Sequence, residues 1–298
     1  MLTAGKHNTL DLILYNFCNF VHLIIRRIYE RKKDFIYFLR GYTYMPQTEI
    51  ATMTYSLPKI VNENGGQTRI FIPKYGIINE RRHQLHEVIR LSGINLIIDD
   101  MDMPLILKVA SIPKERMQVY FIDSEDYFKG RQVESDKNDK LYKDNDERSI
   151  FFAKGVIETI KKLNWAPDLI HVHGWIASLL PLYLKNYYNE EPMFQNTKVV
   201  VSLYENEIKG KLDKKIVDKI KFDEIEDKNL SILENPTYEN LYKISLALAD
   251  GVIFTADIKN SFNKVLKKMK VPVLECFLKS DYEKEYMDFY NKFLINED

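Results

Sequence analysis

Short apolar runs alternate with longer amphipathic segments along most of the chain. The run Lys198–Leu203 reads KVVVSL, and its consecutive β-branched residues are typical of a strand buried on both faces. The segment Arg148–Leu163 instead repeats apolar residues at helical spacing, which predicts an amphipathic helix. The strands predicted in this way are Phe35–Leu39, Thr68–Ile72, Asn95–Ile98, Leu105–Ala110, Met117–Ile122, Asp168–His171, Lys198–Leu203, Gly251–Thr255 and Val271–Cys276. The predicted helices include Glu49–Asn64, Arg148–Leu163, Ile176–Asn186, Tyr238–Ala249, Ile258–Met269 and Ser280–Phe293.

This alternation predicts an α/β fold, with a Rossmann-like, mostly parallel sheet flanked by helices on both faces. Ligands of such sheets bind at the carboxyl ends of the strands, so the residues that follow each strand are the first candidates for a site. Asp144 or Asp146 is expected to cap the start of the predicted helix Arg148–Leu163. The polar stretch 134–147 predicts an exposed loop, and the mixed charges of 209–236 predict an exposed helical excursion.

The composition excludes several classes of protein. Lysine and arginine number 43, as do aspartate and glutamate, so the chain lacks the net positive charge that nucleic-acid binding favours. The chain has only 11 glycines, and it contains neither GxGxxG nor GxxxxGK[ST]. A Rossmann dinucleotide fingerprint and a P-loop are therefore not expected.

Residues 10–25, LDLILYNFCNFVHLII, form the most apolar stretch of the chain. A membrane-spanning helix needs roughly 20 consecutive apolar residues, and this shorter run contains Asp11 and His22, so we do not expect it to span a membrane. A basic cluster follows the run rather than preceding it, unlike the pattern of a signal peptide. An amphipathic interfacial or partner-binding helix and a poorly ordered extension both remain open.

The cysteines and histidines predict neither a metal site nor a cofactor. Cys18 and Cys276 lie far apart without zinc-site spacing, which is typical of free thiols in a reducing cytoplasm. His83 and His86 are three residues apart in RRHQLHEVIR, and on a helix they would share a face. No further ligand accompanies them in the sequence, so a metal is not expected there.

Five phrases, in order, resemble one family. LPKIVNENGGQTRIFIPKYG, VYFIDSEDYF, DNDERSIFFAKGVIE, APDLIHVHGWIASLLPLYLK and LALADGVIFTA begin at Leu57, Val119, Asp144, Ala166 and Leu246. They are similar to segments of the N-terminal domain of the glycogen and starch synthases, glycosyltransferases of family 5 and GT-B fold that use ADP-glucose. The resemblance implies that residues 34–298 equal the N-terminal half of such an enzyme, and that residues 1–33 are an extension.

The resemblance also implies candidate site residues. APDLIHVHGW is similar to the family's PDxxHxHDW, in which a histidine lies beside the transferred glucose. That role falls on His173, whose neutral form can donate to a sugar hydroxyl near pH 7. Substrate contacts are implied for His171, Asn145, Arg148 and Tyr204. A structural alternative is that His171 and His173 end a strand and satisfy nearby backbone groups.

The chain departs from the family pattern at the donor loop. The family's KTGGLGD loop holds the donor diphosphate, and its lysine aligns with Pro46 and its glycines with Thr48 and Glu49. A carboxylate where a phosphate is bound is electrostatically unfavourable. The acidic residue that precedes the loop aligns with Arg40. The aspartate of HxHDW is replaced by Gly174, and the histidine and asparagine of the next motif align with Tyr204 and Glu205.

Three functions follow from these observations. The first is a glucosyltransferase of glycogen synthase type that uses a nucleotide sugar and an α-glucan. It requires the second half of the cleft, supplied by another polypeptide or by a homo-oligomer. The second is a non-catalytic glucan-binding or regulatory module of glycogen metabolism. The third is an interaction protein whose ancestry does not indicate its function.

Overall fold

The computed structural model describes residues 34–38, 44, 49–112, 115, 117–204, 210–254, 258–275 and 282–294. Several sequence predictions fall outside these ranges. They concern the extension 1–33, both cysteines, and the residues Arg40, Pro46, Thr48 and Glu205.

The described strands form a mixed sheet that is parallel over most of its width. The strands are β1 (Asp34–Phe38), β2 (Gln67–Pro73), β3 (His86–Glu87), β4 (Ile94–Ile98), β5 (Met101–Ile112), β6 (Met117–Asp123), β7 (Leu169–His173), β8 (Lys198–Leu203), β9 (Gly251–Phe254) and β10 (Val273–Glu275). Their order is β10-β9-β8-β7-β1-β2-β6-β5-β3, and β4 pairs with β5. The pairs from β10 to β6 are parallel, which confirms the predicted architecture. Strand β5 is antiparallel to β6 because the short connection between them allows a hairpin but no crossover.

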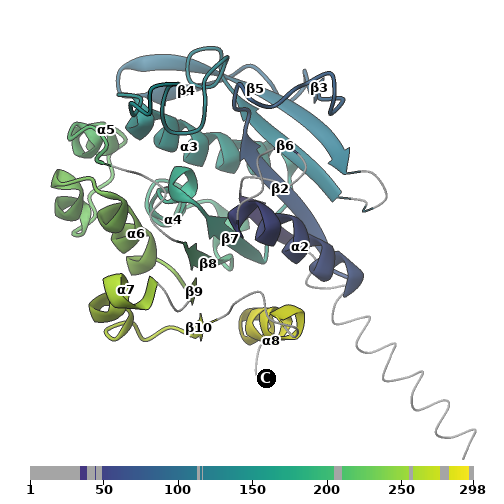
Figure 1. The fold of residues 1–298 in the computed structure, drawn as a ribbon, viewed down its shortest axis with the longest axis vertical. Helices are drawn as coiled ribbons and strands as arrows, with labels where there is room; N and C mark the ends of the chain where they lie inside the picture. Colours follow the sequence, from purple (N-terminus) through teal and green to yellow (C-terminus); the bar gives the residue numbers. More distant parts are fainter. Residues whose placement is uncertain are drawn as a thin grey trace, which may run out of the picture.

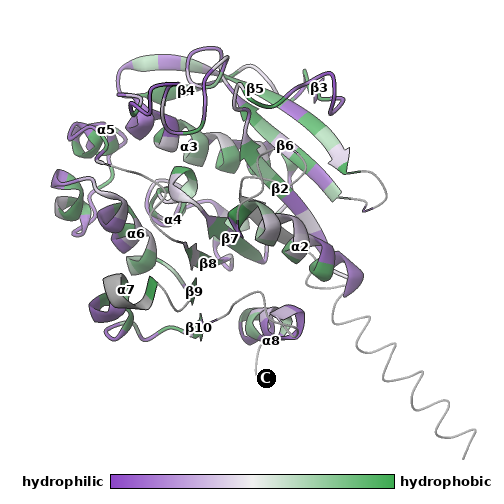
Figure 2. Ribbon diagram, viewed as in Figure 1, coloured by the Kyte–Doolittle hydropathy of each residue, from purple (hydrophilic) through white to green (hydrophobic). Residues whose placement is uncertain are grey.

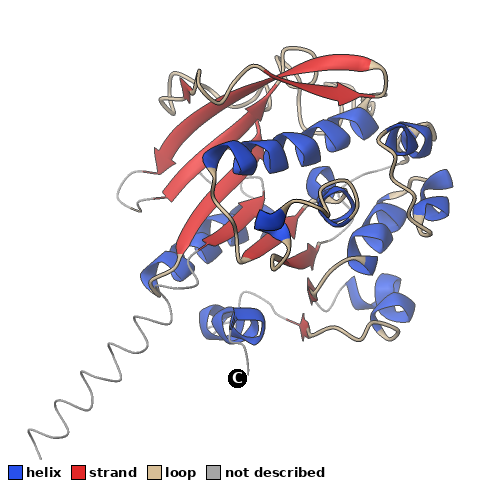
Figure 3. Ribbon diagram, turned by 180° about the vertical axis from the view of Figure 1, so that it is seen from behind, coloured by secondary structure: helices blue, strands red, loops and turns tan. Residues whose placement is uncertain are grey.

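Helices cover both faces of this sheet. They are α2 (Glu49–Glu63), α3 (Asn145–Leu163), α4 (Leu180–Lys185), α5 (Ile216–Phe222), α6 (Tyr238–Ala247), α7 (Lys259–Leu266) and α8 (Tyr282–Leu294). Figures 1 and 3, which view the molecule from opposite sides, show α2 over one face and α3 over the other. Helix α8 packs beside α2, while α4 and α5 pack against α3. Among the described residues, no helix is both long enough and apolar enough to cross a membrane.

The predicted helix Ile176–Asn186 is wrong as a single element. A short 3₁₀ turn, η1 (Trp175–Ala177), comes first, and α4 begins only at Leu180. The physical reason is Pro181, which has no N–H and would clash with a preceding carbonyl in the interior of a longer helix. In the observed structure Pro181 lies in the first turn of α4, where its missing N–H leaves no helical hydrogen bond unmade.

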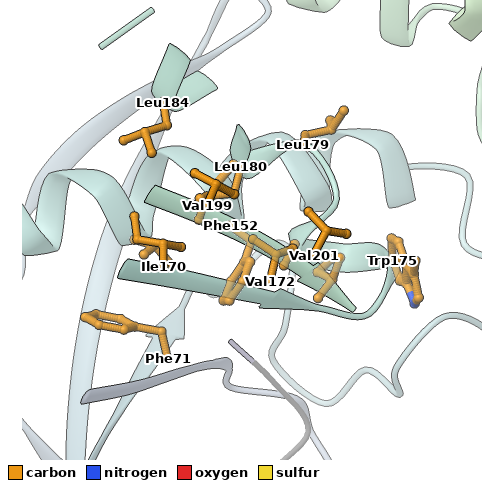
Figure 4. Packing of buried hydrophobic residues seen from close by; sticks show 14 of the residues in the cluster. Phe71, Phe152, Ile170, Val172, Trp175, Leu179, Leu180, Leu184, Val199 and Val201 are labelled. Carbon is orange, nitrogen blue, oxygen red and sulfur yellow. The ribbon is translucent and has the colours of Figure 1, made fainter. Parts of the chain in front are cut away.

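The core is densest where the middle strands meet α3 and α4. Figure 4 shows Ile170 and Val172 of β7 beside Val199 and Val201 of β8, with Phe152 and Leu180 close to them. All six side chains are fully buried. Figure 2 shows the same region in the colours of apolar residues, with the polar positions concentrated on loops and outer helix faces. The consecutive β-branched residues therefore correctly identified β8 as a strand buried on both faces.

The charge-rich segment 209–236 differs from the exposed excursion that its composition predicts. It contains α5 and a 3₁₀ turn, η3 (Leu230–Glu234), and several of its lysines are exposed. Lys219 and Asp223, however, are buried and form ion pairs with residues of α3. Mixed charges along a segment do not reveal which of them find partners in another element, and here two of them attach the segment to the core.

Gly251 of β9 lies directly beneath two aromatic rings of α8. A Cβ atom on Gly251 would lie 2.5 Å from Cζ of Phe293 and 3.1 Å from Cζ of Phe289. We expect Gly251→Val to lower the free energy of unfolding by about 1–3 kcal/mol, because the added methyl groups must displace these rings. Urea unfolding measures the loss. The double variant Gly251→Val/Phe293→Ala is expected to cost less than the sum of the single variants, and strict additivity would contradict this packing.

Candidate functional site

His171 and His173 lie at the carboxyl end of β7, near the middle of the sheet. Residues two apart on a strand point to the same face, so both imidazoles lie on the side of the sheet that α8 covers. Their ring centroids are 3.8 Å apart. The neighbouring strand β8 ends in register with them, with His173 opposite Ser202.

The hydroxyl partners of these rings lie on α8, on β8 and on the residue that directly follows β8. His171 binds the Tyr290 hydroxyl through Nδ1 and the Ser202 hydroxyl through Nε2, each at 2.8 Å. His173 binds the Tyr204 hydroxyl through Nδ1 at 2.6 Å. Tyr238 of α6 in turn donates to the backbone carbonyl of Tyr204. These three ring nitrogens thus bind side-chain hydroxyls rather than nearby backbone groups. We call the five residues that take part the histidine cluster: His171, His173, Ser202, Tyr204 and Tyr290.

Burial keeps both histidines neutral. It lowers the pKa of His173 to about 3, because a charged imidazolium would lose its hydration. The pKa of His171 also falls well below its usual value, first through burial and then through the adjacent His173. A neutral imidazole has one donor and one acceptor nitrogen, which fits the hydroxyl partners. His173 is only 1% exposed, so it lies beneath the surface rather than in an open cleft.

Gly174 follows the histidines at the position where the family pattern has aspartate. Its φ of 78° and ψ of 159° place it in a region of backbone conformation that is nearly exclusive to glycine. The glycine therefore permits the abrupt turn from β7 into η1. This turn brings Trp175 and Ile176 into the core directly after the histidine cluster.

Asn145 and Arg148 lie at the start of α3 and are fully buried. Arg148 donates to the carbonyls of Gln132 and Val133 at 3.0 and 2.7 Å, and to Oδ1 of Asn145 at 2.6 Å. Asn145 donates to the carbonyl of Glu134 at 2.7 Å. These two side chains hold the polar loop 132–134 against α3. Of the predicted site residues, the structure thus joins His171, His173 and Tyr204 by hydrogen bonds, whereas Asn145 and Arg148 bond to this loop.

The predicted capping hydrogen bond at the start of α3 is absent, so this prediction is wrong. Asp144 occupies the N-cap position, but its side chain makes no capping bond. Its carboxylate instead forms two bonds with Arg131, at 2.5 and 2.6 Å, and the Arg131 partner helps to lower the Asp144 pKa against the effect of burial. The alternative cap, Asp146, pairs with Lys219 at 2.6 Å. Two charge-assisted bonds to arginine are stronger than the single bond that the carboxylate would accept from a backbone N–H, which accounts for the difference.

Glu49 is the first residue of α2 and is exposed. The resemblance aligns this position with a glycine of the family's donor loop, and this alignment stays a prediction. A carboxylate at a helix N-terminus is stabilised by the helix dipole, which would otherwise favour a bound phosphate. Glu49 therefore places a negative charge at the N-terminus of α2.

The paired histidines of RRHQLHEVIR do not share a helix. His83 lies in a turn with its ring 4.8 Å from that of Tyr44, and His86 lies in β3. In the described part of the chain, no group of three or more His, Cys, Asp or Glu side chains is arranged to hold a metal ion.

Two members of the histidine cluster have no counterpart in the sequence predictions. Ser202 lies two residues before Tyr204. Because alternate residues of a strand point to the same face, this spacing could have indicated Ser202 once Tyr204 was a candidate. Tyr290 lies more than a hundred residues from His171, on a helix whose docking face the apolar pattern alone does not fix.

A Rossmann-like parallel sheet with helices on both faces is the fold of one half of a GT-B glycosyltransferase. The family model described as "Starch synthase catalytic domain" matches residues 42–256. The chain belongs to this family, as its glycogen synthase-like phrases predicted.

Similar proteins agree with this assignment. The chain is 39% identical over 177 residues to the glycogen synthase of Chlorobium limicola, a match that covers 59% of the chain and 36% of that protein. It is 40% identical over 158 residues to the glycogen synthase of Chlorobaculum tepidum, covering 53% of the chain and 32% of that protein. The chain thus matches about a third of the length of these relatives.

A solved structure supports the fold. The catalytic domain of starch synthase IV from Arabidopsis thaliana, bound to ADP and acarbose, superposes with a TM-score of 0.66 at 13% identity. The superposition covers 82% of this chain and 51% of that one. The predicted GT-B half is therefore confirmed as a fold.

Proposed function

We propose that this chain is the acceptor-facing half of a glycogen or starch synthase-like glucosyltransferase, which contributes the histidine cluster to a cleft completed by a second polypeptide or another copy. The observation that carries the proposal is the placement of His173 and Tyr204 at the carboxyl ends of two adjacent parallel strands. Ligands of such sheets bind at this edge. The substrates would be a nucleotide sugar, with ADP-glucose as the donor, and an α-glucan.

The role of His173 in this proposal is to hold a sugar hydroxyl, not to transfer a proton. Its pKa of about 3 makes the imidazole neutral at physiological pH, and a neutral ring can donate or accept one hydrogen bond without a charge. The hydroxyl of Tyr204 at 2.6 Å fixes the ring orientation. Asn145 and Arg148 would contribute through the loop they hold, and His171 through the orientation of His173.

A second function, a non-catalytic glucan-binding or regulatory module, is favoured by two features. His173 is almost fully buried, and Glu49 places a carboxylate at the helix start where the family binds the donor diphosphate. Transfer of glucose depends on stabilising the leaving diphosphate, so a negative charge there opposes turnover while leaving glucan binding possible.

Radiolabelled ADP-glucose and glycogen separate these functions. The chain is assayed alone and together with the remaining carboxyl-terminal part of Chlorobium limicola glycogen synthase, and sedimentation with glycogen is measured separately. Transfer that falls to background in His173→Ala, but persists in the matched variant His83→Ala, supports the enzyme. Glycogen binding without transfer in either assay supports the module. Absence of both contradicts both functions.

A further inference from the structure

A pocket of about 610 Å³ opens where α2 ends beside the first residues of β2 and β6. Because β2 and β6 are parallel, their first residues lie at the amino-terminal edge of the sheet, opposite the edge where β7 ends at His173. Figure 1 shows how these strands lie in the sheet. The side chains that matter for its chemistry are Lys59, Asn62, Glu63, Arg69, Glu115 and Gln118. The pocket is large enough for a small metabolite and is lined mainly by polar groups.

Arg69 is the cation of this pocket that lacks a counter-ion. Its guanidinium carbon lies 4.2 Å from the ring centroid of Trp165, which holds the group in place by stacking. Within the described ranges no carboxylate pairs with Arg69. Arg69 lines the pocket and is only partly buried, so an anionic ligand that enters the pocket would meet a cation without a counter-ion.

The other charges of the pocket are already balanced. Lys59 lies 3.2 Å from Glu115, which also accepts a hydrogen bond from Tyr55 at 3.2 Å. Glu63 is exposed at the rim, 4.0 Å from Lys59. The carboxylates therefore do not neutralise Arg69, but they provide acceptors for hydroxyl groups of a ligand.

Two amides of the pocket have their oxygens occupied by hydroxyl donors. Thr68 donates to Oδ1 of Asn62 at 2.8 Å, and Tyr120 donates to Oε1 of Gln118 at 2.9 Å. Burial raises the pKa of Tyr120, so its hydroxyl keeps the proton that it donates. With both amide oxygens occupied, the NH₂ groups are the parts that remain to bind an acceptor. Gln118 lies opposite Arg69 in the strand register, which places its amide beside the guanidinium.

We propose that this pocket binds a small phosphorylated metabolite with several hydroxyl groups, such as a sugar monophosphate. The phosphate would lie on Arg69 and the two amides, and the hydroxyls would meet Glu63 and Glu115. Three donors from separate groups suit the three terminal oxygens of a phosphate better than the two coplanar oxygens of a carboxylate. The site lies on the opposite edge of the sheet from the histidine cluster, and this proposal is independent of the proposed transferase function.

Isothermal titration calorimetry on the full chain tests the site with glucose 6-phosphate, glucose and gluconate as probes. We expect binding of glucose 6-phosphate and at least about tenfold weaker binding of glucose and gluconate. Arg69→Gln and Gln118→Glu are each expected to weaken the binding of glucose 6-phosphate by about tenfold or more. Gln118 is exposed, so its variant keeps the fold even if Arg69→Gln does not. Arg81→Gln, at an exposed arginine outside the pocket, serves as the matched control and is expected to bind normally.

Three results would overturn the proposal. The first is no binding of glucose 6-phosphate to the intact chain at millimolar concentration. The second is an affinity for glucose or gluconate equal to that for glucose 6-phosphate, which would mean that the pocket does not recognise the phosphate. The third is normal affinity in Gln118→Glu, together with normal affinity in any folded Arg69→Gln protein.

Discussion

Replacing Asp223 by alanine is expected to lower the free energy of unfolding by about 3–5 kcal/mol, because it leaves a buried ammonium without its counter-ion. Asp223 binds Lys154 of α3 through Oδ1 at 2.6 Å and the Tyr183 hydroxyl through Oδ2 at 2.7 Å. The side chains of Lys154 and Asp223 are 4% and 5% exposed. The carbonyl of Ile97 accepts a further bond from Lys154 but carries no full charge.

Urea unfolding followed by circular dichroism measures this loss. Asp218→Ala, at an exposed carboxylate on the same charge-rich segment, is the matched control and is expected to change stability by less than about 0.5 kcal/mol. Replacing both partners, as in Lys154→Met/Asp223→Leu, is expected to cost less than Asp223→Ala, because no buried charge then remains. A loss of less than about 1 kcal/mol in Asp223→Ala would mean that Lys154 reaches water in solution.

The same ion pair illustrates what the sequence leaves open about the fold. Lys154 lies on a helix whose apolar positions predict its core-facing side, and nothing in that periodicity indicates that a lysine is buried there as well. Its partner comes from a segment almost seventy residues further along the chain, where charges of both signs are interspersed. Local pattern predicts elements, but the pairing of charges between elements depends on tertiary packing.

The parts that were predicted correctly share a physical basis. The consecutive β-branched residues of β8 and the helical spacing of α3 are local sequence patterns. They predict the correct elements because β8 and α3 are buried in the way that these patterns indicate. The helix predicted from Ile176 failed because one proline outweighs the apolar periodicity on both sides of it.

The candidate site was predicted in part for the same reason. His171 and His173 are close in sequence and on one strand, so their proximity follows from local geometry. Tyr290 reaches them from α8, and only the docked structure shows it. For Arg148 the resemblance implies a substrate contact, which stays a prediction. The structure shows its guanidinium bound to backbone carbonyls of a loop, a role that the sequence did not indicate.

Acid is expected to destabilise the chain through the histidine cluster. The pKa of His173 is about 3 in the folded protein, whereas an unfolded histidine titrates near 6.5. Between these two pKa values the unfolded state binds more protons than the folded state. The contribution of neutral, buried His173 to stability is therefore complete above about pH 6.5 and is lost as the pH falls toward 3. At about 1.4 kcal/mol per pH unit, His173 accounts for a loss of roughly 2 kcal/mol between pH 7 and pH 5. His171, whose pKa is also lowered, acts in the same direction.

The comparison of variants isolates this effect, because Asp146 titrates in the same range with the opposite sign. Its pKa is raised to about 6, chiefly by burial, so the folded state binds the extra proton there. Free energies of unfolding are therefore measured in urea at pH 7 and pH 5 for the parent chain, for His173→Gln and for His86→Gln, which replaces an exposed histidine. We expect the parent and His86→Gln to lose about 2 kcal/mol more than His173→Gln over this interval. Equal losses in all three proteins would mean that His173 is accessible to protons in the folded state, and a histidine so exposed would be open to a sugar hydroxyl without any rearrangement of Tyr204.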